Sequence, residues 1–196
     1  MRIISGRARG RRLFTPPGQS RDIRPTSDRA REALFSILAG NIKGARVLDL
    51  YAGTGALGVE ALSRGARQVV FVDTDRQALA LIQKNCQLCL QDDTADSATR
   101  AVIIRHDLKR GLSFQSHAPI EDSFFDIIFL DPPYKKGLAA DSLTDLSRSE
   151  LVTEETIVIA EEGSGETLAR SFGPLTLYDQ RRYGDTGFWF YRLRSA

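Results

Sequence analysis

The stretch Val47–Gly58 reads VLDLYAGTGALG, and its pattern decides the fold. It runs from an apolar segment through glycines into a helical pattern, which is the context that gives a glycine motif meaning. Gly53 and Gly55 allow the backbone to pass close to a ligand, and Gly58 allows a helix to pack on a sheet. We therefore expect a ligand-binding turn between a buried strand and a helix.

Two acidic residues accompany this loop. Asp73 follows Gly55 by 18 residues, at the tip of the next apolar run, where a carboxylate can accept the hydroxyl hydrogens of a ribose. Asp49 precedes Gly53 by four residues, and an acid there would repel a pyrophosphate but suits an ammonium or a sulfonium. The loop alone leaves open a methyltransferase, a dinucleotide-binding oxidoreductase of the NAD type and a purely structural turn. Asp49 favours the methyltransferase.

From Ala45 onward, strand and helix patterns alternate. Apolar runs typical of buried strands lie at Arg46–Leu50, Gln68–Val72, Ala101–Ile104, Phe124–Leu130 and Thr156–Ala160. Helical patterns lie between most of these runs, at Ala56–Arg64, Arg76–Leu90 and Leu138–Arg148. Unbroken apolar strands joined by helices predict an α/β fold with a parallel sheet covered on both faces.

The N-terminal part differs from this alternation. The first 22 residues carry two glycines and a Pro-Pro-Gly turn, which predicts a small hairpin or arm within the same domain as residues 23–196. A helix should follow Pro25, with Thr26 or Ser27 as its N-cap and Gly40 as its stop.

The C-terminal part also changes pattern. We expect a short helix at Glu166–Phe172. Two strands, Leu175–Tyr183 and Gly187–Arg194, then follow only a few residues apart. This spacing predicts an antiparallel hairpin at the edge of the sheet.

The tetrapeptide Asp131-Pro132-Pro133-Tyr134 follows directly on the apolar run Phe124–Leu130. It therefore lies at the carboxyl end of a buried strand, where open α/β sheets bind ligands. A Pro-Pro turn that merely closes a strand is the alternative. Downstream of a glycine loop in this strand order, the tetrapeptide favours catalysis, and a dehydrogenase has no use for it.

The tetrapeptide suits methylation of an exocyclic amine, a poor nucleophile because its lone pair is delocalised into the base ring. The Asp131 carboxylate and the Pro132 carbonyl offer acceptors for the two N–H groups, which would favour a more reactive nitrogen. The prolines fix φ and remove competing N–H donors. Tyr134 can stack on a base lifted out of its helix. Positioning and preorganised acceptors would supply the acceleration, so no metal is expected.

Three other features carry weaker signals. Asp107 follows the run Ala101–Ile104 and could accept from the adenine amino group of a cofactor, with a surface turn acid as the alternative. Cys86 and Cys89 have CxxC spacing, but helical spacing places both on an apolar face. We expect two packed core thiols rather than a redox or metal site.

Charge is unevenly distributed along the chain. The net charge is +2, but residues 1–31 hold nine arginines against two aspartates, so the remainder is mildly acidic. An arginine-rich arm favours a polyanion partner, since arginine binds phosphate in a bidentate fork, whereas a solubilising tail is the alternative. We expect this partner to be RNA, bound by Arg7, Arg9, Arg11 and Arg12. With no run of about 18 apolar residues and no signal-like segment, we expect a cytoplasmic protein without membrane association.

Several segments resemble the RsmD-type bacterial 16S ribosomal RNA guanine-N2 methyltransferases, and the likeness runs nearly end to end. The most specific are RIISGRARGRRLFTPPG at the start, IRPTSDRAREALFSIL at Ile23–Leu38, DLYAGTGALGVEALSRGA at Asp49–Ala66, DPPY, and RRYGDTGFWFY near the end. DPPY alone would also suit DNA or RNA adenine methylation or protein glutamine methylation, and RPTSDRAREALF narrows the choice. There are two departures: Tyr51, where the family usually has phenylalanine, and a longer polar loop at Gln91–Arg100.

The resemblance implies a class I, Rossmann-like methyltransferase fold with a seven-stranded, mostly parallel sheet. S-adenosylmethionine is the implied donor, and N2 of a guanine in 16S ribosomal RNA the implied target, within a small-subunit particle. The implied catalytic residues are Asp131, Pro132, Pro133 and Tyr134. The cofactor site is expected to comprise Asp49, Ala52, Gly53, Gly55, Asp73, Thr74, Asp107 and Leu108, closed over by Arg24 and Thr26. A monomer is the simplest assumption, and a non-catalytic RNA-binding module is a further alternative.

Overall fold

The computed structural model describes residues 1–16, 25–92, 100–114 and 124–194, except for the side chains of residues 25–27. Its helices are α1 (Pro25–Ile37), α2 (Ala39–Ile42), α3 (Ala56–Ser63), α4 (Arg76–Leu90), the 3-10 helix η1 (Leu108–Arg110) and α6 (Leu138–Leu146). Its strands are β1 (Arg46–Leu50), β2 (Gln68–Asp73), β3 (Ala101–Arg105), β4 (Ile127–Leu130), β5 (Ile157–Gly163), β6 (Ser171–Phe172), β7 (Leu175–Tyr183) and β8 (Thr186–Leu193). Among these described helices, none is long and apolar enough to cross a lipid bilayer.

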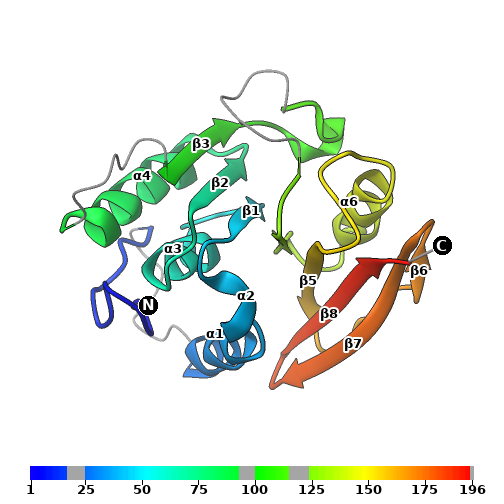
Figure 1. The fold of residues 1–196 in the computed structure, drawn as a ribbon, viewed down its shortest axis with the longest axis horizontal. Helices are drawn as coiled ribbons and strands as arrows, with labels where there is room; N and C mark the ends of the chain where they lie inside the picture. Colours follow the sequence, from blue (N-terminus) through cyan, green and yellow to red (C-terminus); the bar gives the residue numbers. More distant parts are fainter. Residues whose placement is uncertain (17–24, 93–99, 115–123, 195–196) are drawn as a thin grey trace.

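The strands form one sheet in the order β3-β2-β1-β4-β5-β8-β7-β6 (Figure 1). The first five are parallel, and β8, β7 and β6 continue the sheet antiparallel. The chain runs outward from β1 to β3 and then returns to β4 on the other side of β1. Strand order therefore reverses between β1 and β4, the place where open α/β sheets bind ligands. The predicted Rossmann-like architecture with an antiparallel C-terminal hairpin is confirmed.

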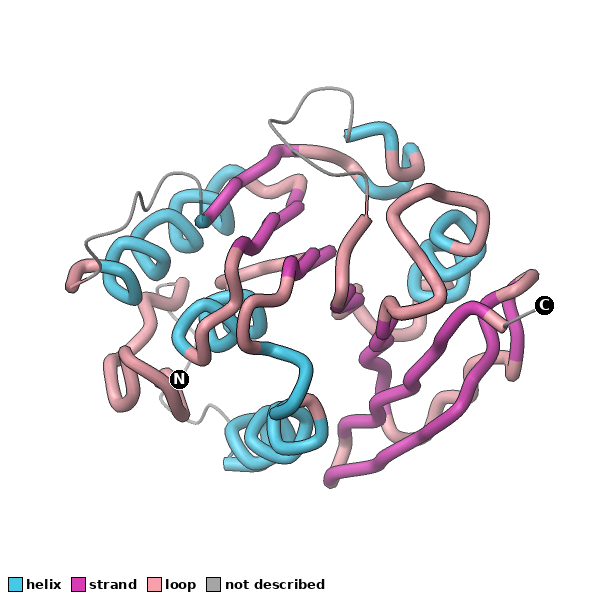
Figure 2. The backbone as a smooth tube through the Cα atoms, in the orientation of Figure 1, coloured by secondary structure: helices cyan, strands magenta, loops and turns pink. Residues whose placement is uncertain are grey.

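Each face of the sheet has its own apolar core, because successive side chains of a strand point to opposite faces. One core lies toward the N-terminal residues and α1–α4, and it includes Val47 and Phe71. The other lies toward α6 and includes Leu48 and Leu130. Figure 2 shows α1–α4 on one side of the strands and α6 on the other. Burial from both sides explains the unbroken apolar runs, and all five residues of β1 are buried.

Two predictions about α1 are wrong. The helix begins at Pro25, so Thr26 and Ser27 lie in its first turn instead of capping it. Proline favours the first helical position because its φ is already helical and its missing N–H would have no partner there. At the other end, α1 stops at Ile37, and Gly40 lies inside the short helix α2.

The helix predicted at Glu166–Phe172 is also wrong. Its last two residues form β6, which pairs antiparallel with the start of β7. Gly173, with φ of 56°, reverses the chain between the two strands. This pairing overrides the local helical pattern and adds an eighth strand to the seven expected.

The first residues of the chain form a hairpin in the structure. Arg2 and Arg12 are antiparallel bridge partners, and the Ile3 N–H donates to the Arg11 carbonyl at 3.0 Å. Ile3 and Ala8 are each 1% exposed and belong to the core shared with α1–α4. The hairpin is therefore packed on the domain rather than extended from it.

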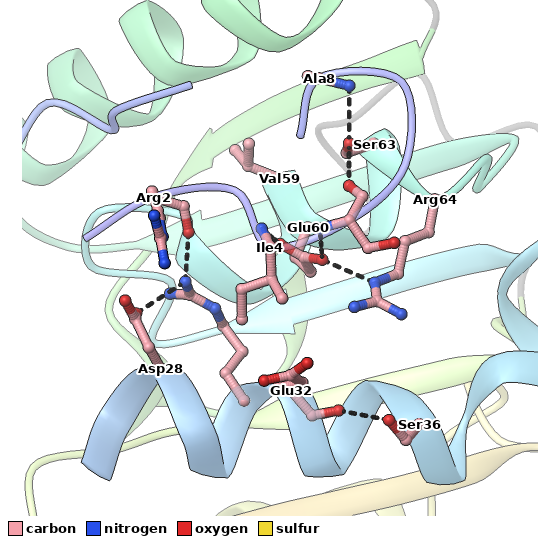
Figure 3. A network of polar contacts seen from close by, with 12 residues as sticks. Arg2, Ile4, Ala8, Asp28, Glu32, Ser36, Val59, Glu60, Ser63 and Arg64 are labelled. Carbon is pink, nitrogen blue, oxygen red and sulfur yellow. Dashed lines mark hydrogen bonds and ion pairs between the residues drawn. The ribbon is translucent and has the colours of Figure 1, made fainter. Parts of the chain in front are cut away.

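Two side chains of α3 hold this hairpin (Figure 3). The Glu60 carboxylate accepts from the Ile4 N–H at 2.7 Å and from Arg64 Nε at 2.7 Å. Ser63 Oγ accepts from the Ala8 N–H at 3.1 Å. A Cβ at Gly6 would lie 2.0 Å from the Ser63 carbonyl oxygen, so only glycine permits this approach.

The two cysteines lie buried on α4 as free thiols. Cys89 Sγ donates to the Val59 carbonyl at 3.7 Å, and burial raises the pKa of Cys89 to about 11. Burial also raises the pKa of Cys86. The prediction of packed core thiols is confirmed.

Candidate active site

The glycine loop lies at the carboxyl ends of β1 and β2. Gly53 has φ of 55° and Gly55 has φ of 76°, both in the region that favours glycine. The Gly53 N–H donates to Asp73 Oδ2 at 2.8 Å, which ties the loop to the end of β2. A Cβ at Gly58 would lie 2.2 Å from Phe71 Cε1, so glycine lets α3 pack closely on the sheet. The structure thus gathers the predicted loop residues at one edge.

Asp49 is buried beneath this loop. It is 1% exposed, and its Oδ2 accepts from the Gly58 N–H at 2.9 Å. Burial raises the pKa of Asp49 to about 8, and the nearby charge of Asp73 adds to the effect. A buried carboxylate in this position is stabilised by a cation. The ammonium and sulfonium of S-adenosylmethionine provide that charge, so the loop and its acid fit the expected donor.

Asp73 orients two backbone segments. Its Oδ2 accepts from Gly53, and its Oδ1 accepts from the Asp75 N–H at 2.9 Å. Each carboxylate oxygen has a second lone pair, so both can still accept a ribose hydroxyl. Of the neighbouring predicted residues, Ala52 is buried and Thr74 is exposed.

Asp107 lies beyond β3 and begins η1. Its Oδ1 accepts from the Lys109 N–H at 3.2 Å, as a turn acid does. Leu108 is buried and lines a cavity of about 310 Å³ together with Tyr51 and Leu138. The contact of Asp107 with an adenine therefore stays a prediction.

The tetrapeptide follows β4 at the same edge of the sheet. Pro132 is buried, Pro133 is exposed and Tyr134 is 38% exposed. Asp131 lines a cavity of about 100 Å³ together with Ala56 from the end of the glycine loop. The carboxylate thus borders a cavity next to the loop instead of being enclosed in the core.

A second carboxylate, absent from the predicted site, lies beside Asp131. Leu130 of β4 pairs with Ala160 of β5, so Asp131 and Glu161 follow next to each other in the register. Glu161 lines the same cavity, and its Oε1 accepts from the Tyr134 hydroxyl at 2.7 Å. The predicted strand ended at Ala160, and one more residue of period-two alternation would have placed Glu161 on the face of Asp131.

Arg31 of α1 lines this cavity too. It belongs to the arginine-rich residues 1–31, yet it is 4% exposed. Its Nη2 donates to the Arg2 carbonyl and to Asp28 Oδ1, the latter at 3.1 Å. Its Nε has no acceptor among the described residues. Helical spacing with Leu34 and Leu38 would have identified Arg31 as an inward-facing residue.

The two carboxylates of the cavity raise each other's energy when both are charged. Burial raises the pKa of Asp131 well above its usual range, and the charge of Glu161 raises it further. Burial also raises the pKa of Glu161, against the lowering effects of the Tyr134 hydroxyl and of Arg31. Donors that bind both carboxylates would relieve this repulsion.

The four arginines assigned to RNA have different surroundings. Arg7, Arg9 and Arg12 are exposed. Arg11 forms an ion pair with Asp92, and its Nη1 donates to a carbonyl of α4 at 2.6 Å. Arg11 therefore fixes the hairpin to the end of α4, a structural role that the assignment to RNA did not include.

A cavity of about 400 Å³ lies where the hairpin meets α1. Arg2, Arg9 and Arg29 line it together with two acidic residues of α1. Arg24, at the predicted closing segment, lies outside the described residues, and only the backbone of Thr26 is described. Their closing role stays a prediction.

The sequence matches the family described as "Conserved hypothetical protein 95" over residues 1–192. It is 31% identical to "Ribosomal RNA small subunit methyltransferase D" of Escherichia coli (strain K12), covering 100% of this chain and 91% of that protein. It is 35% identical to the Haemophilus influenzae protein of the same name, covering 82% and 78%. The solved structure of yhhF from Escherichia coli has a TM-score of 0.78 at 30% identity, covering 100% and 99%. The likeness therefore includes both the glycine loop and the tetrapeptide.

Proposed function

From the premise that this chain belongs to the "Conserved hypothetical protein 95" family, we propose that it transfers a methyl group from S-adenosylmethionine to 16S ribosomal RNA of the small subunit. As the finer assignment we propose the exocyclic N2 of a guanine. One observation carries the proposal: a glycine loop over the buried Asp49 and a tetrapeptide bearing Asp131 meet across the reversal between β1 and β4. Relatives named small subunit methyltransferases support the class of substrate.

The cofactor half of the site would hold S-adenosylmethionine, which when bound supplies a methyl group on a sulfonium. Asp73 would accept the ribose hydroxyls, and Asp49 would balance the positive charge. A Cβ at Gly53 would have only the Tyr51 carbonyl oxygen within 4 Å, so this glycine leaves room for the ligand, whereas a Cβ at Gly55 would press on Ile82 and Phe71. The remaining proposed contacts are Ala52, Thr74, Asp107 and Leu108, with Arg24 and Thr26 closing the site.

The base half would hold the amine. The Asp131 carboxylate and the Pro132 carbonyl would accept its two hydrogens, and the partly exposed ring of Tyr134 would stack on the base. When the new nitrogen–carbon bond replaces the carbon–sulfur bond of the donor, Asp131 would take the surplus amine proton. The raised pKa of Asp131 suits it to take that proton.

RNA would be bound as part of a small-subunit particle in the cytoplasm, by a monomer of this chain. Three exposed arginines of the hairpin, Arg7, Arg9 and Arg12, would contact phosphates. The arginines of the cavity between the hairpin and α1 extend this basic surface. The Pro133 edge of the tetrapeptide is exposed, so a base could reach the site from solvent.

The direct test is transfer of tritium from labelled S-adenosylmethionine to small subunits that lack the modification. We expect label in 16S ribosomal RNA, with mass spectrometry mapping it to N2 of one guanine. Naked 16S RNA, assayed in parallel, distinguishes free RNA from the assembled particle as substrate. Steeply salt-dependent RNA binding without transfer would instead indicate a non-catalytic binding module. A rise in melting temperature with NAD but not with S-adenosylmethionine would favour an oxidoreductase.

A further inference from the structure

The small cavity beside the tetrapeptide gathers three charged side chains. It has a volume of about 100 Å³ and lies where α1, the start of α3 and the ends of β4 and β5 come together. Asp131, Glu161 and Arg31 all line it. The cavity therefore combines two carboxylate acceptors with one guanidinium donor.

Glu161 is held in place through one of its two oxygens. Oε1 accepts from the Tyr134 hydroxyl at 2.7 Å. An ionised carboxylate has about four lone-pair positions, so most of its acceptor capacity is left for another partner. Because Tyr134 belongs to the same tetrapeptide as Asp131, this bond also fixes the two carboxylates relative to each other.

Arg31 is a buried donor with capacity left over. Its Nη2 donates to the Arg2 carbonyl of the hairpin and to Asp28 of its own helix, and these two bonds anchor the guanidinium. Its Nε is buried and has no acceptor in the described part of the chain. Buried donors without acceptors are rare in native proteins, so a ligand that brings an acceptor would satisfy this group.

We propose, on the basis of the proposed function, that Glu161 and Arg31 read the Watson–Crick edge of the target base and select guanine. Guanine presents its N2 amine and N1–H as donors and O6 as an acceptor. Asp131 would hold the amine, Glu161 would accept from N1–H, and Arg31 would donate to O6. Adenine has an unprotonated N1 that would face the Glu161 carboxylate and an amine that would face Arg31. A site built for donors in this order rejects a base that lacks them.

A purely structural ion cluster is the competing explanation. Glu60 and Glu161 both act electrostatically on Arg31, and such a cluster would hold α1 to the sheet without touching a base. In that case, removing the charge of Glu161 would change the rate equally for every base. Base reading instead requires an effect that depends on which base is presented.

The experiment uses small subunits reconstituted with 16S RNA that carries guanosine or 2-aminopurine riboside at the mapped position. 2-Aminopurine keeps the N2 amine but has an unprotonated N1 and no O6. The wild-type enzyme should prefer guanosine in kcat/KM by at least about tenfold. Glu161→Gln, whose amide can donate to the unprotonated N1, should reduce this preference by at least about tenfold. Glu162→Gln, the next carboxylate on the opposite face of β5, should leave the preference unchanged.

Arg31→Lys gives a second readout, because it should slow methylation of guanosine but not of 2-aminopurine, which has no O6. Equal wild-type rates on the two bases, or an unchanged preference in a folded Glu161→Gln enzyme, would overturn the proposal. If Glu161→Gln does not fold by circular dichroism, the wild-type ratio and Arg31→Lys decide. Wild-type enzyme that labels neither substrate would contradict the proposed function itself, which keeps the two failures distinct.

Discussion

At the ends of β1 and β2, the carboxylates of Asp49 and Asp73 accept hydrogen bonds from the backbone of the glycine loop, whereas at the ends of β4 and β5 those of Asp131 and Glu161 line a cavity. In the proposed cofactor half, Asp49 and Asp73 therefore fix the backbone conformation of the loop. Among the described residues, the carboxylates of Asp131 and Glu161 have one hydrogen bond to another side chain. In it, Glu161 accepts from the Tyr134 hydroxyl. From this contrast we infer that Asp49 and Asp73 preorganise the loop, whereas Asp131 and Glu161 are available to a substrate.

The contrast predicts its largest effect at Asp131. Asp131→Asn should lower kcat by about 100- to 1,000-fold, because an amide cannot act as the anionic acceptor of an amine proton. The dissociation constant for S-adenosylmethionine should stay unchanged, since the cofactor half is intact. Tritium transfer and calorimetry measure the two quantities. Glu154→Gln, an exposed carboxylate just before β5, is the matched control and should keep full activity. Unchanged turnover in Asp131→Asn would remove this residue from the mechanism.

Gly58 tests the claim that the cofactor half depends on backbone packing. An added Cβ would lie 2.2 Å from Phe71 Cε1, and overpacking of this kind costs about 1–3 kcal/mol. Alanine gains only about 1 kcal/mol over glycine from helix propensity, so the clash prevails and Gly58→Ala should lower the free energy of unfolding. Urea denaturation measures it. Gly165→Ala, whose Cβ would meet nothing within 4 Å, is the control. Equal stability of the two variants would contradict the packing role.

The same contrast explains what could be predicted from sequence. The parallel strands carry unbroken apolar runs because both faces are buried, and the ligand edge is marked by Asp49, Asp73 and Asp131 at or just beyond strand ends. The packing role of Gly58 could be predicted because the glycine motif lies between a strand and a helix, where the last glycine lets the helix pack closely on the sheet. These signals are local, so the glycine loop and the place of its acidic residues in the sheet could be predicted from the sequence, while their contacts with a cofactor stay predictions.

Fewer residues of the proposed base half could be predicted from the sequence, because this half is assembled from distant segments. Glu161 becomes part of the site only through the register of β4 with β5, and Arg31 only through the packing of α1. Likewise β6 exists because Phe172 pairs with Leu175 across a glycine turn, although its local sequence has a helical pattern. Local patterns can show which way Glu161 and Arg31 face, but a single segment does not show which distant segment they meet.

The role of Asp49 in the cofactor half can be tested through the pH dependence of S-adenosylmethionine binding. Its pKa of about 8 means that the carboxyl is largely neutral at pH 6 to 7, and a cationic ligand must drive off its proton. Affinity for S-adenosylmethionine should therefore rise with pH up to about 8, by at most about tenfold per unit, and then level off. Asp49→Asn removes this dependence but keeps an oxygen for the Gly58 N–H. The ligand's own amine titrates near pH 8 in both proteins, so calorimetry of the pair isolates Asp49. Identical pH profiles would show that Asp49 does not meet the cation.

The arginines of the hairpin show the same contrast as the acids of the site, because some are bonded to the protein and others are exposed. The change in RNA binding expected from the exposed ones is the smallest of the predicted effects. Arg11 is bound to α4 and Asp92, whereas Arg9 and Arg12 are exposed. Replacing Arg9 and Arg12 with alanine should reduce the slope of log affinity against log salt by about 2 for 16S RNA, with no loss of stability. Arg11→Ala should instead lower the free energy of unfolding by about 1 kcal/mol and leave the slope nearly unchanged, because its donors already have protein partners. Filter binding across a salt series and urea denaturation separate the two. A slope altered equally by both changes would mean that Arg11 leaves α4 to bind RNA, and the division between structural and ligand-binding arginines would not hold.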